Sequence, residues 1–111
     1  MPYGLKRTDL RAIAQAKLDD AVLLLQHRRF SNAYYLAGYT IEIGLKACIA
    51  AQVSAETIPD KAFLNRVLKH EFSVLVGLAG LATALKEQQD KDPLFAAMWA
   101  IVSEWSPDAR H

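Results

Sequence analysis

Cysteine is nearly missing from this chain, because Cys48 is the single cysteine among its 111 residues. One cysteine excludes an internal disulfide and any metal site built from several cysteines. Cys48 lies in an apolar run, so we interpret it as a small buried hydrophobic residue. A glycine-rich phosphate loop, a metal-ligand spacing and a nucleophile elbow are absent too. The sequence therefore predicts no metal site and no cofactor.

An excess of either charge is also lacking, since 13 Lys and Arg residues stand against 12 Asp and Glu residues. A net charge of +1 creates no general attraction for a nucleic-acid backbone, so contact with nucleotide or RNA would need a local cluster. What the chain has in excess is hydrophobic residues, at 52% against roughly 45–50% in ordinary domains. The length predicts one domain over residues 1–111, and a homodimer interface is where we expect the surplus to be buried.

No hydrophobic run is long enough to cross a membrane. The longest nearly uncharged stretch, Phe30 to Val53, is interrupted by Glu42 and Lys46 and is typical of a core helix. Charged residues also interrupt the first ten positions, which argues against a signal peptide. We therefore expect a cytoplasmic protein with no membrane contact.

Hydrophobic periodicity predicts an all-α fold of four main helices and a short helical turn. The expected segments are a helix from Thr8 or Asp9 to Arg28, one from Ser31 or Asn32 to Gln52, a turn over Lys61 to Lys69, a helix from His70–Ser73 to Gln89, and one from Pro93 to Trp105. The second helix is apolar on nearly every side and should be the central one. Gly38 and Gly44 cost it about 1 kcal/mol each relative to Ala, and we expect a closely packed neighbouring helix to compensate.

Three segments, in this order, resemble the HEPN family (higher eukaryotes and prokaryotes nucleotide-binding). Residues 33–47 of the second helix read A-Y-Y-L-A-G-Y-T-I-E-I-G-L-K-A, as in the core helix of prokaryotic HEPN proteins. Residues 70–75 read H-E-F-S-V-L, like the family's entry to the next helix. Residues 104–111 resemble a Trp-Ser-Pro stretch that precedes a further helix in longer members. The resemblance covers the chain from about Phe30 to its end.

The resemblance implies an up-and-down antiparallel bundle that dimerises, here without a final helix. It also implies a family of toxin ribonucleases, nucleotide-binding modules and inactive partners, which work with an antitoxin or a nucleotidyltransferase-like protein. The ribonucleases carry an Arg, four to six residues and then a His. The nearest pattern here is Arg66-Val67-Leu68-Lys69-His70, with only three intervening residues and no polar residue directly after the Arg. We therefore expect little or no catalysis, and name Arg66 and His70 as candidate catalytic residues only.

The first candidate site is the stripe Tyr35, Tyr39, Glu42 and Lys46, whose spacings of four, three and four place the side chains on one helix face. Two charges on an apolar helix must be paired or must reach water through a cleft. In a functional interpretation, the tyrosines stack a base and Lys46 binds a phosphate. The alternative is a structural ion pair beside two core tyrosines.

The second candidate site consists of Arg66, Lys69 and His70, where the third helix should begin. A helix N-terminus attracts anions, so a phosphate could dock here. For RNA cleavage without a metal, a neutral His70 would take the 2′-hydroxyl proton and Arg66 would stabilise the phosphorane. The alternative is that His70 caps the helix and the cations are solvated.

Together these patterns predict a dimeric HEPN-like module that binds or acts on nucleotide or RNA, as part of a toxin–antitoxin or defence system. The second hypothesis is a non-catalytic module for dimerisation and protein interaction. The two differ in what they need, because an enzyme needs Arg66 and His70 in one cleft whereas an interaction module needs only an apolar interface.

Overall fold

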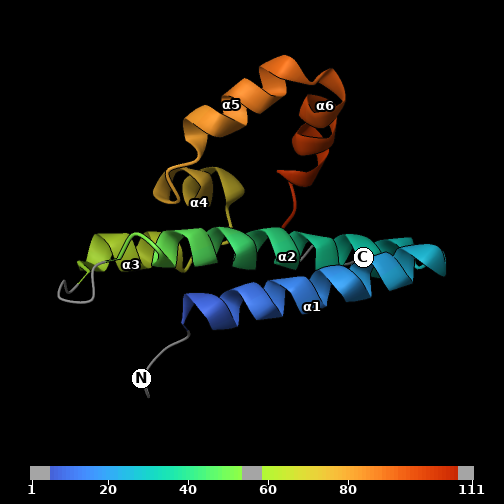
Figure 1. The fold of residues 1–111 in the computed structure, drawn as a ribbon, viewed down its shortest axis with the longest axis horizontal. Coiled ribbons are helices and arrows are strands. Elements are labelled where there is room, and N and C mark those ends of the chain that lie inside the picture. The colour runs from blue at the N-terminus through green and yellow to red at the C-terminus, as the bar shows by residue number, and fades with distance from the viewer. Residues whose placement is uncertain (1–5, 54–58, 108–111) are drawn as a thin grey trace.

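The computed structural model describes residues 6–53 and 59–107, and in these residues every regular element is a helix. The all-α prediction is confirmed. The six helices of the described residues form three groups: a long antiparallel pair, a short helix, and an arch of three (Figure 1). Their bounds are α1 Arg7–Gln26, α2 Phe30–Ala50, α3 Lys61–Val67, α4 Phe72–Leu78, α5 Ala82–Lys91 and α6 Pro93–Val102.

The long pair is a helical hairpin of α1 and α2, which lie side by side along most of their length (Figure 1). Small side chains let the two helices approach, since Ala14 and Ala21 of α1 and Ala33 and Ala47 of α2 are all buried. The chain reverses over His27 to Arg29, where Arg28 adopts a positive φ of 59°.

The central position predicted for the second helix is confirmed. On the side of α2 opposite α1, the helices α4, α5 and α6 rise as an arch (Figure 1). The core lies at the foot of this arch, where Leu45 and Ile49 of α2 contact the fully buried Phe72 and Leu75 of α4. Trp105, just after α6, returns to α2 and closes the core.

The expected third helix is wrong, because the chain breaks between α4 and α5. Gly80 adopts a positive φ of 73°, which a helix does not contain and which glycine adopts without a steric penalty. The expected last helix ends early as well, at Val102 instead of Trp105. The break at Gly80 raises the five expected segments to six helices in the described residues, and the single four-helix up-and-down bundle is not confirmed by their arrangement.

The close approach expected at Gly38 comes from a side chain and not from a helix. The indole of Trp105 lies directly against Gly38, in the space that a β-carbon would occupy. At Gly44 no other described atom lies within 4 Å of that space, so the expectation is wrong there. Cys48 is exposed, which corrects its interpretation as a buried residue. None of the helices in residues 6–53 and 59–107 is long and apolar enough to span a membrane.

Candidate functional site

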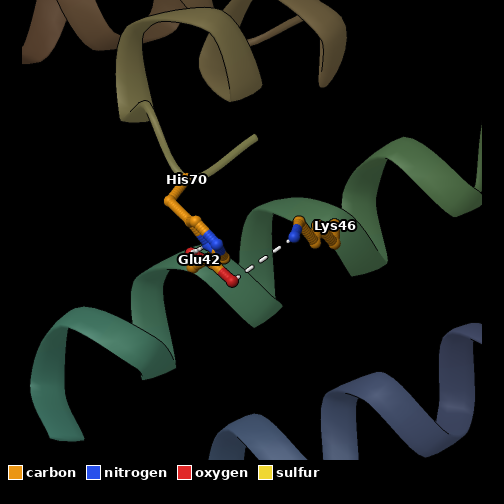
Figure 2. A network of polar contacts seen from close by, with 3 residues as sticks. All are labelled: Glu42, Lys46 and His70. Carbon is orange, nitrogen blue, oxygen red and sulfur yellow. Dashed lines mark hydrogen bonds and ion pairs between the residues drawn. The ribbon is translucent and has the colours of Figure 1, made fainter. Parts of the chain in front are cut away.

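Glu42 is the only buried charged or polar residue among those that the structure describes, with a relative exposure of 4%. It lies in the middle of α2, on the side that faces the segment between α3 and α4 (Figure 2). A buried carboxylate is costly unless its oxygens accept hydrogen bonds or face a cation. Glu42 has a partner for each oxygen, and these two partners define the site.

The first partner is Lys46, one helical turn along α2. Its Nζ atom lies 3.3 Å from Oε2 of Glu42, and its side chain is 19% exposed. The ion pair predicted from the spacing of four residues is therefore present, with the Glu N-terminal to the Lys, the favourable order. Lys46 thus donates a hydrogen bond to one carboxylate oxygen of Glu42, and its side chain still reaches solvent.

The second partner is His70, which descends from the segment before α4 onto the carboxylate (Figure 2). Its Nδ1 atom lies 2.5 Å from Oε1 of Glu42, and its side chain is 49% exposed. Since a carboxylate only accepts hydrogen bonds, we assign the hydrogen to Nδ1. His70 therefore does not cap α4: its ring contacts α2, and the N-cap position belongs to Glu71.

This contact gives His70 a fixed orientation and leaves one ring nitrogen for chemistry. Nε2 has no hydrogen-bond partner within the described part of the chain. A ring held through Nδ1 by a carboxylate presents Nε2 as an acceptor when neutral and as a donor when protonated. The geometry suits a hydrogen bond to a phosphate oxygen or a proton exchange with a bound hydroxyl.

The two tyrosines of the predicted stripe are half-buried and lie in an aromatic cluster. The rings of Tyr35 and Tyr39 meet edge to face, with centroids 5.1 Å apart. Tyr39 also contacts Trp105 edge to face at 4.9 Å, and Phe72 stacks on the other side of the cluster against Trp105 at 5.7 Å. The tyrosines thus pack against Trp105 without stacking on it, and their use for stacking a nucleotide base stays a prediction.

The predicted cations Arg66 and Lys69 are both exposed and lie close to His70 in sequence. Arg66 is in the last turn of α3, whereas Lys69 and His70 belong to the segment that joins α3 to α4. No ion pair within the described residues involves Arg66 or Lys69. Because α3 ends at Val67, Arg66 and His70 do not share one continuous helix.

The sequence predicts Glu42, Lys46 and His70 as site residues, but it does not predict the contact between Glu42 and His70. Glu42 and His70 are 28 positions apart and were assigned to separate candidate sites. One signal pointed to the contact: a Glu in an otherwise apolar helix needs more partners than one Lys, because a carboxylate has about four acceptor positions. Trp105 packs against the tyrosines beside the site, and the sequence names it only as the end of the last expected helix.

Comparisons with known proteins gave no match to a family model, to a curated protein or to a solved structure. The resemblance to the HEPN family therefore stays a prediction. Among the described residues, no group of three or more His, Cys, Asp or Glu side chains is arranged to hold a metal ion.

Proposed function

We propose that this chain is a HEPN-like dimeric helical module that binds a phosphate group of a nucleotide or of RNA beside His70. The observation that carries the proposal is the half-exposed His70 ring, held at Nδ1 by the buried Glu42 carboxylate. The protonated ring donates a hydrogen bond from Nε2, and a donor that is already oriented loses little conformational freedom on binding. Arg66 and Lys69 add exposed positive charge in the adjoining segment, and charge-assisted hydrogen bonds to phosphate are among the strong ones.

We propose binding without efficient cleavage. The Arg66 guanidinium is exposed in the last turn of α3, and no hydrogen bond in the described residues fixes it relative to His70. Stabilisation of a phosphorane requires donors that are already aimed at the developing charge. An arginine without a fixed position supplies attraction for a phosphate but little selective stabilisation of the transition state.

The wider setting belongs to the same proposal and rests on the resemblance of residues 33–47, 70–75 and 104–111 to the HEPN family. It comprises a cytoplasmic location, a role in a toxin–antitoxin or defence system, and an antitoxin or nucleotidyltransferase-like protein as partner. It also comprises a homodimer, supported by the hydrophobic surplus, and the up-and-down bundle of this chain's own helices that the resemblance implies.

The test is binding of a fluorescently labelled single-stranded RNA, measured by anisotropy over a series of salt concentrations. The logarithm of the association constant falls linearly with the logarithm of the salt concentration. Loss of one phosphate contact to a single strand should make this slope shallower by about 0.7. We expect this change for Lys69→Ala and a loss of affinity for His70→Ala. The matched control is Lys86→Ala on α5, which should change neither quantity. Equal binding by all four proteins would contradict the proposal.

The second candidate function is a non-catalytic module for protein interaction. It is favoured by exposed apolar side chains on α1 and α6, among them Leu25 at 55% and Leu94 at 70% exposure. A protein that self-associates but binds neither RNA nor mononucleotides would support this candidate over the first.

A further inference from the structure

A hollow lies at the open end of the α1–α2 hairpin, where α1 begins and α2 ends (Figure 1). Its volume is about 360 Å³, which falls within the roughly 300–1,000 Å³ of small-molecule sites. Its lining consists of two arginines of α1 and four small residues in the second half of α2 and just after it: Arg7, Arg11, Gly44, Ala47, Cys48 and Ala51. Gly44 is two positions from Glu42, about 200° around the helix, so this hollow and the His70 site lie on opposite sides of α2.

Both guanidinium groups of the hollow are available to a ligand. Arg7 and Arg11 are exposed and stand four positions apart, which places them on one side of α1. Neither has an ion-pair partner within residues 6–53 and 59–107, and none of the described lining residues is acidic. Asp9 lies about 200° around the helix from Arg7, and its carboxylate accepts a hydrogen bond from the backbone N–H of Lys6. The described lining of the hollow therefore carries two positive charges and no negative one.

The helix ends at the hollow leave this positive charge unopposed. Helix α1 begins here with the positive end of its dipole, and α2 ends here with the negative end of its own. Each end is equivalent to about half an elementary charge, so the two contributions offset each other. The arginines then set the local potential, and that potential attracts anions. Arginine binds carboxylate and phosphate groups through two parallel hydrogen bonds, which adds geometric selection to the attraction.

The floor of the hollow determines what the anion is attached to. Gly44 lies inside α2, where glycine is less favourable than alanine, and no other described atom lies within 4 Å of the space that a β-carbon would occupy. The position therefore leaves the backbone of α2 open towards the hollow. Ala47 and Ala51 continue this small apolar surface at spacings of three and four residues. A compact apolar group fits such a floor.

We propose that this hollow binds a small organic anion, with its carboxylate or phosphate group on Arg7 and Arg11 and its compact apolar body on Gly44. The inference goes beyond the proposed function, since it concerns a second site on the other side of α2. Cys48 supplies a direct probe of this site, because it lines the hollow, is exposed and is the single cysteine of the chain.

The first test compares two aromatic disulfide reagents that react with the Cys48 thiol. Dithiobis(nitrobenzoate) is a dianion of the proposed ligand class, whereas dithiodipyridine is uncharged. In the double variant Arg7→Gln with Arg11→Gln, the anionic reagent should react about 10-fold more slowly and the neutral one should change by less than about 2-fold. The matched control is Lys86→Gln with Lys91→Gln on α5, which removes the same charge elsewhere and should change neither rate. Far-UV circular dichroism checks that the variants keep their helix content.

The second test measures binding at equilibrium, as protection of Cys48 from the neutral reagent. Benzoate or phenyl phosphate should protect saturably in the wild type and not in the arginine double variant, and benzyl alcohol should not protect. The better protector identifies the preferred anionic group. No protection by either anion up to about 20 mM would overturn the proposal, because binding that weak is not specific recognition. Equal protection by benzyl alcohol would overturn the role of the arginines.

Substitution of Gly44 tests where the apolar body lies. Gly44→Ala should raise the melting temperature, because alanine favours a helix and the position is open. Its methyl group would also occupy the floor, so the benzoate concentration for half protection should rise by at least about 5-fold. Gly77→Ala, likewise open, should raise the melting temperature and leave protection unchanged. Unchanged protection in Gly44→Ala would overturn this placement of the ligand.

The two sites can fail separately. Because His70 lies on the other side of α2, the arginine double variant should keep the response of His70 to added nucleotide. A double variant that loses both protection of Cys48 and the response of His70 would overturn the inference that the hollow is a separate site. A wild type that shows protection of Cys48 without a response of His70 would contradict the proposed function alone.

Discussion

Replacement of Glu42 by alanine should destabilise the protein by about 2 kcal/mol. The change removes the acceptor of two charge-assisted hydrogen bonds, each worth about 1.5–3 kcal/mol. However, Lys46 and His70 are 19% and 49% exposed, so both recover water once the carboxylate is gone. The loss should therefore lie below the roughly 3–5 kcal/mol of a broken, fully buried pair and above the roughly 1 kcal/mol of a surface pair.

The assay is urea unfolding followed by circular dichroism, at one fixed protein concentration because a dimer's stability depends on it. The control is Glu87→Ala on α5, an exposed glutamate without an ion pair in the described residues, which should change stability by less than about 0.5 kcal/mol. Glu42→Gln keeps the volume but can accept from only one of the two donors, so it should lose about half as much as Glu42→Ala. A loss under about 1 kcal/mol for Glu42→Ala would refute the buried, doubly paired carboxylate. A loss above about 3 kcal/mol would refute the argument that its partners recover water.

Three further predictions concern the fold and the chemistry. Gly38→Ala should destabilise by about 1–3 kcal/mol, because the new methyl group would overlap the Trp105 indole, and a thermal melt checks this. Gly80→Ala should destabilise the protein by about 1–2 kcal/mol in the same melt, because alanine is strained at the positive φ of this position. Gly77→Ala should instead stabilise it by about 0.5–1 kcal/mol, because the position lies in open space within α4 and alanine favours a helix. Purified protein incubated with RNA and no metal should show little or no cleavage, and cleavage that disappears in His70→Ala would contradict this.

Long periodic segments were the part of the fold that the sequence predicted well. Helix α2 was found with its ends within about two residues, because an apolar pattern on all sides leaves few alternatives to a buried helix. The last helix begins at Pro93 as predicted, and the Asp92 side chain before it accepts a hydrogen bond from the backbone N–H of Phe95. Such end signals are local, so they can be seen without knowing the rest of the structure.

The errors arose where a single residue's environment overrides the pattern. Apolar residues continue in a helical period through Ala79 and Leu81, so periodicity hides the break that Gly80 makes with its positive φ. Exposure of Cys48 depends on which side of α2 the neighbouring helices cover, and a helix apolar all round does not reveal that side. The contact of Trp105 with Gly38 depends on a turn after α6 that the sequence pattern did not indicate.

The candidate site was predictable as two halves and not as one unit. The spacing of Glu42 and Lys46 on one helix fixes their contact. The contact of Glu42 with His70 depends on the path of the chain from α3 to α4, which brings a residue outside both helices onto α2. Local rules carry no information on such a path, and only the unmet hydrogen-bonding need of a buried carboxylate indicated it.

The most direct test of the proposed function is an NMR titration that observes the ring nitrogens of His70. His27, which is exposed at the end of α1, serves as the internal control histidine. On addition of adenosine or uridine monophosphate, or of a short single-stranded RNA, we predict saturable shifts of the His70 signals and no change at His27. Unchanged His70 signals up to about 10 mM nucleotide and in the presence of the RNA would contradict a phosphate site at this residue, because binding that weak is not specific recognition.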